Sequence, residues 1–259
     1  MSYFLSSLPL WIAILLLVVI PTAIAMLLQA LIHRWVGVER LVQNNEIAGF
    51  KFATVGVIYA VLLAFTVIVV WEKFSAAETA VDQEAASIAA LFRYAEGAQP
   101  EAVALRAAIL NYAKTAITDD WPAMAHEKES HATTRALDAV YGAALALNRT
   151  ETRDTADMSE VFAQIDNVTA SRRIRLHLAT GFVPNVIWAA LFAGGFLTIG
   201  FTLFFGSKNL LAQVTMTGVL SILVTLGLVV IVSIDHPFTG PVQVHPDPLA
   251  DVLADLEQP

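Results

Sequence analysis

Residues 45–71 decide the fold, and they read NEIAGFKFATVGVIYAVLLAFTVIVVW. This stretch is apolar over the ~20 residues that an α-helix needs to cross the hydrocarbon core of a bilayer. It nevertheless begins with the polar residues Asn45, Glu46 and Lys51. Small residues recur along it at near four-residue intervals, at Gly49, Ala53, Gly56, Ala60 and Ala64. We therefore expect a membrane helix whose faces differ from one another.

The composition of the whole chain agrees with a membrane protein. Of its 259 residues, 57% are hydrophobic and only 15% are charged, and the mean hydropathy is +0.65. These values lie outside the range of ordinary soluble domains. The chain has no cysteine, which excludes disulfides, thiolate metal sites and cysteine nucleophiles. Its formal net charge of −8 gives no electrostatic support to nucleic-acid binding.

Four apolar segments predict an all-α protein with four transmembrane helices and a helical extramembrane domain inserted between spans two and three. Four spans place both termini on the same side of the membrane as this helical domain. The first span contains Pro21, where we expect a kink. The expected parts are a first transmembrane hairpin (1–71, spans 8–32 and 48–71), a helical domain (72–183), a second hairpin (184–234, spans 184–205 and 210–234) and a Pro-rich tail with a short docking helix (235–259).

The second span is expected to continue beyond the membrane, because the sequence has no proline or glycine between Gly56 and Gly97. Apolar residues recur along this continuation in a seam with a heptad-like spacing, interrupted by one acidic residue. The seam consists of Phe74, Ala77, Val81, Glu84, Ile88, Leu91 and Ala95. Two interpretations are open: the seam is the core face of a helical bundle, or it forms a coiled coil around a symmetry axis.

A helical wheel at ~100° per residue separates two faces of the second span. The small residues listed above share one face, which suits close packing against another helix of the same chain or of a neighbour. The opposite face surrounds Lys51 and carries large apolar residues: Val55, Ile58, Leu62, Phe65 and Val69. This face either contacts lipid, with Lys51 reaching the headgroups, or surrounds an axis and gates a pore by dewetting. In a pore, Lys51 and Glu72 would form charged rings at the two mouths.

Two stretches carry a resemblance to a known family. Residues 45–74, NEIAGFKFATVGVIYAVLLAFTVIVVWEKF, and residues 235–253, DHPFTGPVQVHPDPLADVL, resemble the bestrophin-like domain family of multipass membrane proteins. The layout is also distantly similar to bestrophin ion channels. That similarity implies a homo-oligomer, with a pentamer as the leading expectation, and an apolar neck at Ile58, Leu62 and Phe65. It also implies a cytoplasmic helical domain. The chain lacks an extended acidic calcium-clasp sequence, so calcium activation is not expected.

The leading hypothesis is therefore an oligomeric ion channel in the plasma (inner) membrane, with a hydrophobic gate on span two and inorganic ions as its cargo. The alternative is a non-conducting membrane scaffold or sensor whose helical domain binds a partner. An enzyme is not expected, because no catalytic set can be assembled from the sequence. No cofactor or metal is expected either, since His126 and His131 lack the spacing of two ligands on one helix face.

Charge does not orient the protein in the membrane. Arg34, Arg40, Lys51 and Lys208 flank one side, and Lys73, Arg172, Arg173 and Arg175 flank the other, so the two sets balance. The three arginines of the second set have two open interpretations. They attract anionic headgroups, or they pair with Asp166 or Glu84 inside the bundle.

Two turns in the polar segments are also informative. Pro237 ends the fourth span, and with Phe238 and Gly240 it is expected to dock the tail on the helical domain or on a neighbouring subunit. Asp119 or Asp120 is expected to cap a helix that begins at Trp121-Pro122.

Overall fold

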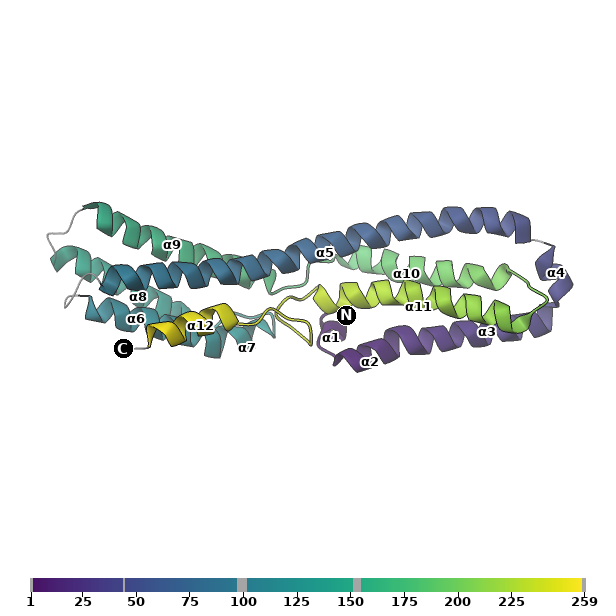
Figure 1. Cartoon of the computed structure of the whole chain (residues 1–259), viewed down its shortest axis with the longest axis horizontal. Helices are drawn as coiled ribbons and strands as arrows, with labels where there is room; N and C mark the ends of the chain where they lie inside the picture. Colours follow the sequence, from purple (N-terminus) through teal and green to yellow (C-terminus); the bar gives the residue numbers. More distant parts are fainter. Residues whose placement is uncertain (1, 44, 97–101, 151–154, 258–259) are drawn as a thin grey trace. The chain divides into compact units, whose positions relative to one another are not determined.

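The computed structural model describes residues 2–43, 45–96, 102–150 and 155–257, and in these ranges it is helical without any strand (Figure 1). The chain divides into two compact units. The membrane unit comprises Met1–Glu72 and Phe182–Asp235, and the helical unit comprises Lys73–Gly181 and His236–Pro259. The long helix α5 (Asn45–Glu96) contributes residues to both units.

Four helical segments of the membrane unit are long and apolar enough to cross a bilayer, which confirms the predicted fold class. The first segment, Leu10–Val36, joins α2 (Leu10–Ile14), the π-helical turn η1 (Leu15–Val19) and α3 (Ile20–Val36). The second segment is the first half of α5. The third segment joins α10 (Asn185–Phe201) and η3 (Thr202–Phe204), and the fourth is α11 (Leu210–Ile234). The short helices α1 (Ser2–Ser6) and α4 (Val38–Val42) complete the unit.

The first span accommodates Pro21 through a change in helix type. Proline has no N–H to donate, and its ring crowds the preceding turn of an α-helix. The structure places the π-helical turn Leu15–Val19 directly before the turn that contains Pro21. The irregularity expected at this proline therefore takes the form of a local widening of the helix.

The helix α11 forms the centre of the membrane unit, and α3 packs along it through a buried polar seam. Thr22 Oγ1 donates a hydrogen bond to Ser221 Oγ (3.1 Å), and Thr217 Oγ1 donates to Gln29 Oε1 (3.3 Å). The Gln29 side chain is fully buried. Because lipid supplies no hydrophobic drive between helices, such contacts help to hold spans together. Hydropathy alone did not predict these polar contacts between α3 and α11.

The helical unit is a bundle around the second half of α5. The other helices are α6 (Val103–Thr115), η2 (Ala116–Asp120), α7 (Trp121–Met124), α8 (His131–Thr150), α9 (Thr155–Leu178) and α12 (Asp247–Leu256). Every residue of the heptad-like seam on α5 is buried, and Ile88, Leu91 and Ala95 belong to the core formed with α6, α8 and α9. The bundle-core interpretation is therefore correct, because the seam has no free face for a coiled coil between copies.

The tail belongs to the helical unit of its own chain. Leu249 of α12 is fully buried in the core, and Val252, Leu253 and Leu256 pack against it. Phe238 is 1% exposed and meets the Trp121 ring edge-on, with 5.9 Å between centroids. Gly240 has a φ of 87°, a conformation that favours glycine, at the turn that leads toward α12.

A buried ionic cluster lies inside the helical unit. Arg175 Nε donates to Glu84 Oε2 (2.8 Å), and Arg175 NH2 also reaches Asp120 Oδ2 (3.2 Å). Arg172 Nε donates to the same Asp120 oxygen (2.8 Å). The Tyr112 hydroxyl donates to Glu84 Oε1 (2.7 Å). Two arginines and two carboxylates thus balance within one desolvated network.

This cluster decides between the two interpretations of the arginines. Arg172 and Arg175 are buried and paired, whereas Arg173 is exposed. Burial alone would lower the pKa of the Arg175 guanidinium, but Glu84 and Asp120 more than offset this and raise it above its ordinary value. Asp120 was expected to cap a helix, but its side chain caps nothing in α7 and binds the arginines instead.

Candidate functional site

The candidate site is the membrane half of α5, and its rotation is fixed by glycines on two neighbouring helices. A Cβ on Gly194 of α10 would lie 2.5 Å from Tyr59 Cδ2, so the tyrosine ring packs directly on the α10 backbone. A Cβ on Gly227 of α11 would lie 2.4 Å from Leu63 Cδ2. The missing side chains therefore let α5 approach both helices closely, as small residues commonly do in membranes.

The first turn of α5 is held by a second set of contacts. Asn45 Nδ2 donates to the Gly206 carbonyl (2.8 Å), and the Gly206 amide donates back to Asn45 Oδ1 (3.0 Å). Further along α5, the Phe52 ring contacts the rings of Phe201 and Phe205, with 5.9 and 5.5 Å between the ring centroids. Asn45, a polar residue at the start of an apolar helix, thus connects span two to the loop before α11.

With these contacts in place, α5 turns one row of large apolar residues mostly away from its own chain. Ile58 is 66% exposed, Phe65 is 65% exposed and Val69 is 49% exposed, while Leu62 is half-buried. The residues recur at helical spacing and so form one row along the span. Lys51 and Glu72, toward the two ends of this row, are both exposed. The structure leaves the predicted gate and mouth residues on one face that is uncovered except at the half-buried Leu62.

The small-residue face of α5 is also largely uncovered. Ala53, Ala60 and Ala64 are exposed, and a Cβ on Gly56 would meet no described atom within 4 Å. Gly49 is the exception, because a Cβ there would touch Phe205 at 3.9 Å. The part of the chain that the structure describes therefore does not supply the packing partner for most of this face. Close packing against a neighbouring copy stays a prediction.

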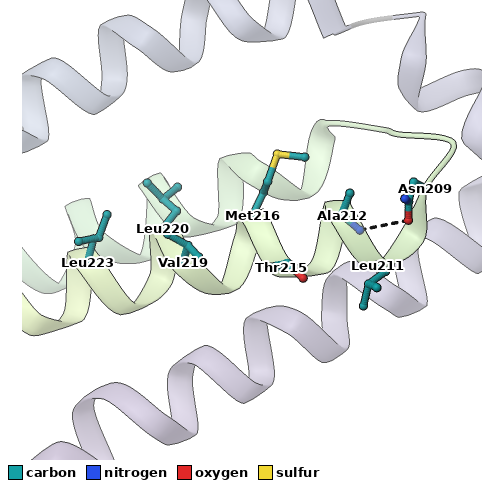
Figure 2. Close-up of a pocket in the computed structure, with 8 residues that line it drawn as sticks. All are labelled: Asn209, Leu211, Ala212, Thr215, Met216, Val219, Leu220 and Leu223. Carbon is teal, nitrogen blue, oxygen red and sulfur yellow. Dashed lines mark hydrogen bonds between the residues drawn. The ribbon is translucent and has the colours of Figure 1, made fainter.

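The exposed surface of α11 forms a shallow pocket of about 550 Å³ (Figure 2). Asn209 Oδ1 accepts a hydrogen bond from the Ala212 amide (3.2 Å) and so caps the helix. Apart from Asn209 and Thr215, the lining side chains are apolar. Within the described residues, no group of three His, Cys, Asp or Glu side chains is placed to hold a metal ion. This surface offers no set of groups for acid–base chemistry.

Comparisons with known proteins agree with this architecture. The family model of the Bestrophin-like domain matches residues 19–249. The chain belongs to this Bestrophin-like family. None of the curated protein sequences matches it significantly.

Solved structures give the fold of this bestrophin-like protein a precedent. It is similar to a crystal structure of a bacterial bestrophin homologue from Klebsiella pneumoniae, with a TM-score of 0.73 and 15% sequence identity over 92% of this chain and 99% of the other. A second crystal structure of that homologue has a TM-score of 0.72 and 14% sequence identity, over 91% of this chain and 97% of the other. At this identity the similarity shows a shared fold.

The close contact between α5 and α10 gives a first prediction. Gly194→Ala forces its new Cβ against the rigid Tyr59 ring, and overpacking of this kind costs ~1–3 kcal/mol. Gly200→Ala on the same helix is the control, because its Cβ meets no described atom within 4 Å. Alanine there is expected to be neutral or to stabilise the helix by up to ~1 kcal/mol. Thermal unfolding in detergent measures both, and equal midpoints would contradict this packing.

Proposed function

We propose that this protein is an oligomeric ion channel in which α5 lines the pore. The observation that carries the proposal is the uncovered apolar row on α5, with a charged residue toward each end. Lys51 and Glu72 are exposed toward the two ends of the row that carries Ile58, Phe65 and Val69. Around an axis, the same arrangement gives a hydrophobic constriction between two charged mouths.

The gate consists of Ile58, Leu62, Phe65 and Val69. Rings of large apolar side chains around a narrow pore expel water, and an ion that enters loses its hydration without compensation. Ile58 and Phe65 present the most exposed side chains of this row, so they contribute the most to the constriction. Lys51 and Glu72 set the local potential at the mouths, where each charge is repeated by every subunit.

A ring of copies supplies the partner that the small-residue face lacks. A head-to-tail contact joins two different surfaces of neighbouring subunits, and it closes into a ring when the rotation permits. Ala53, Ala60 and Ala64 allow a neighbouring helix to approach the α5 backbone. Membership of the Bestrophin-like family supports a homo-oligomer, with a pentamer as the leading candidate. It also supports an inner-membrane protein whose helical unit and termini face the cytoplasm.

Reconstitution tests the proposal. We expect native mass spectrometry of the detergent-solubilised full chain to show a single closed oligomer. We also expect liposomes that contain it to release entrapped KCl faster than empty liposomes. A monomer, or a folded oligomer without ion flux, would contradict the channel. The second of these results would leave a scaffold that binds its partner through the helical unit.

A further inference from the structure

A pocket lies at the end of the membrane unit where the third span is joined to α11. Its volume is about 810 Å³, within the ~300–1,000 Å³ of pockets that hold small ligands. Gly49 and Phe52 line it from α5, Lys208 from the loop before α11, and Met216 and Leu220 from α11 itself. Met216 is 60% exposed, so the pocket is open to the surface that meets lipid.

Most of the polar side chains in this pocket already make hydrogen bonds within the chain. Gln213 Nε2 donates to a backbone carbonyl of the loop before α11 (3.0 Å), and Thr217 Oγ1 donates to Gln29 Oε1 of α3 (3.3 Å). Thr202 Oγ1 donates to a carbonyl of its own helix, and Asn45 is paired with the loop as described above. The apolar residues complete this part of the lining. It therefore suits a hydrocarbon chain.

The outer end of the pocket is different, because it carries a positive charge. Of the described residues that line the pocket, Lys208 alone is charged; it is exposed, and no described carboxylate pairs with it. The adjacent Ser207 hydroxyl accepts a hydrogen bond from the Asn209 amide (3.2 Å) and keeps its own hydrogen to donate. The first amides of α11 add a partial positive charge nearby. This end therefore favours an anionic group.

The length of the pocket along α11 fits one leaflet of a bilayer. At ~1.5 Å per residue, the chain from Lys208 to Leu220 covers ~18 Å, little more than half of a ~30 Å hydrocarbon core. A transmembrane helix of a second copy would need a groove through both leaflets. A single phospholipid has an anionic head at the membrane surface and a hydrocarbon chain directed inward. It matches both the length of the pocket and the order of its charged and apolar parts.

We propose that this pocket binds one acidic phospholipid, with its phosphodiester at Lys208 and Ser207 and one acyl chain along Phe52, Met216 and Leu220. A lipid with a net negative charge is preferred, because the ammonium of a zwitterionic head competes with Lys208 for the phosphate. Since Phe52 belongs to α5, the bound lipid contacts the helix that carries the proposed gate. Lipid binding does not require ion conduction, so it is tested independently of the channel.

A photoactivatable lipid locates the site. Phosphatidylglycerol with a diazirine in one acyl chain bonds covalently to its neighbours on irradiation. With the full chain freed of native lipid in detergent, we expect saturable labelling of peptides from the first turns of α5 or the first half of α11. Unlabelled phosphatidylglycerol should compete roughly fivefold better than phosphatidylcholine with the same chains, the ratio expected for one lysine near the membrane surface.

Variants of Lys208 test the charge. In Lys208→Gln the two competitors should become equal, and in Lys208→Arg the preference should remain. Lys51→Gln, at the other lysine of the membrane unit, is the matched control and should also keep the preference. A competitor ratio that Lys208→Gln leaves unchanged, or that Lys51→Gln abolishes equally, would overturn the proposal.

A variant of Gly49 tests the apolar part of the pocket. A Cβ at Gly49 would meet Phe205 at an ordinary 3.9 Å, so Gly49→Leu adds a side chain to the wall of the pocket. This variant should abolish the saturable labelling. Labelling that falls only outside α5 and α11 in the wild type would overturn the proposal.

Discussion

Arg175→Ala is expected to lower the midpoint of thermal unfolding of the full chain by about 6–20 °C. Removing one partner of a buried ion pair costs ~3–5 kcal/mol, because the other charge remains buried without compensation. A change of 1 kcal/mol shifts the midpoint by roughly 2–4 °C in a protein of this size. Here the loss leaves Glu84 without its guanidinium and leaves Asp120 with Arg172 alone. Circular dichroism of the detergent-solubilised protein measures the shift.

The neighbouring Arg173 provides the control for this experiment. It lies on the same helix, two residues away, and is exposed. Substitutions at such surface positions usually change stability by less than ~0.5 kcal/mol, so Arg173→Ala should leave the midpoint nearly unchanged. If Arg173→Ala and Arg175→Ala shifted the midpoint equally, the cluster would not be the source of the stability. Arg175→Met with Glu84→Gln should recover part of the loss, because it removes both charges of the pair.

Phe65→Ala is expected to raise the ion flux through reconstituted protein by about tenfold or more. The change removes a ring of phenyl groups from the proposed constriction, so water and ions enter more easily. A barrier lower by ~1.4 kcal/mol already gives a tenfold faster rate. Release of entrapped KCl from liposomes with matched protein content measures the effect. Leu62→Ala should also raise the flux, but less, because Leu62 is half-buried against its own chain.

The control for the gate is Phe204, which has nearly the same exposure as Phe65, 63% against 65%. It lies at the end of the third span, on η3 and not on α5. Phe204→Ala should leave the flux as in the wild type. A flux that Phe65→Ala leaves unchanged would remove this residue from the gate. A flux that both substitutions raise equally would indicate a general leak of the destabilised membrane unit.

Local patterns in the sequence were sufficient to predict the spans, the inserted helical domain and the continuation of span two. Hydropathy over ~20 residues reports membrane insertion directly, and a long run without proline or glycine reports a long helix. The seam on α5 was predicted as well, but its partner was not. Periodicity shows that a face is buried and does not show by what. Pairing of an arginine with Glu84 was one of two open interpretations, and the structure shows which arginine, Arg175, lies beside it.

Contacts between residues far apart in the chain were beyond local patterns. Asp120 precedes Trp121-Pro122 and so has the position of a helix cap. Its carboxylate instead accepts charge-assisted hydrogen bonds from two arginines of α9. The pair of Gln29 and Thr217 joins residues 188 positions apart in the chain. The pocket beside the loop before α11 likewise depends on helix packing. For the gate, the sequence predicted that α5 has two different faces. It did not predict which of these faces the other helices of the same chain cover.

Thiol modification of single-cysteine variants tests the central claim, that the uncovered row of α5 lines an ion path. The chain has no cysteine, so each introduced thiol is the only target for a membrane-impermeant, charged thiol reagent. We predict that the reagent blocks KCl flux through Phe65→Cys and Ile58→Cys proteoliposomes and leaves Phe204→Cys unaffected. Flux that persists in both α5 variants after complete modification, or that is blocked equally in all three, would contradict the account.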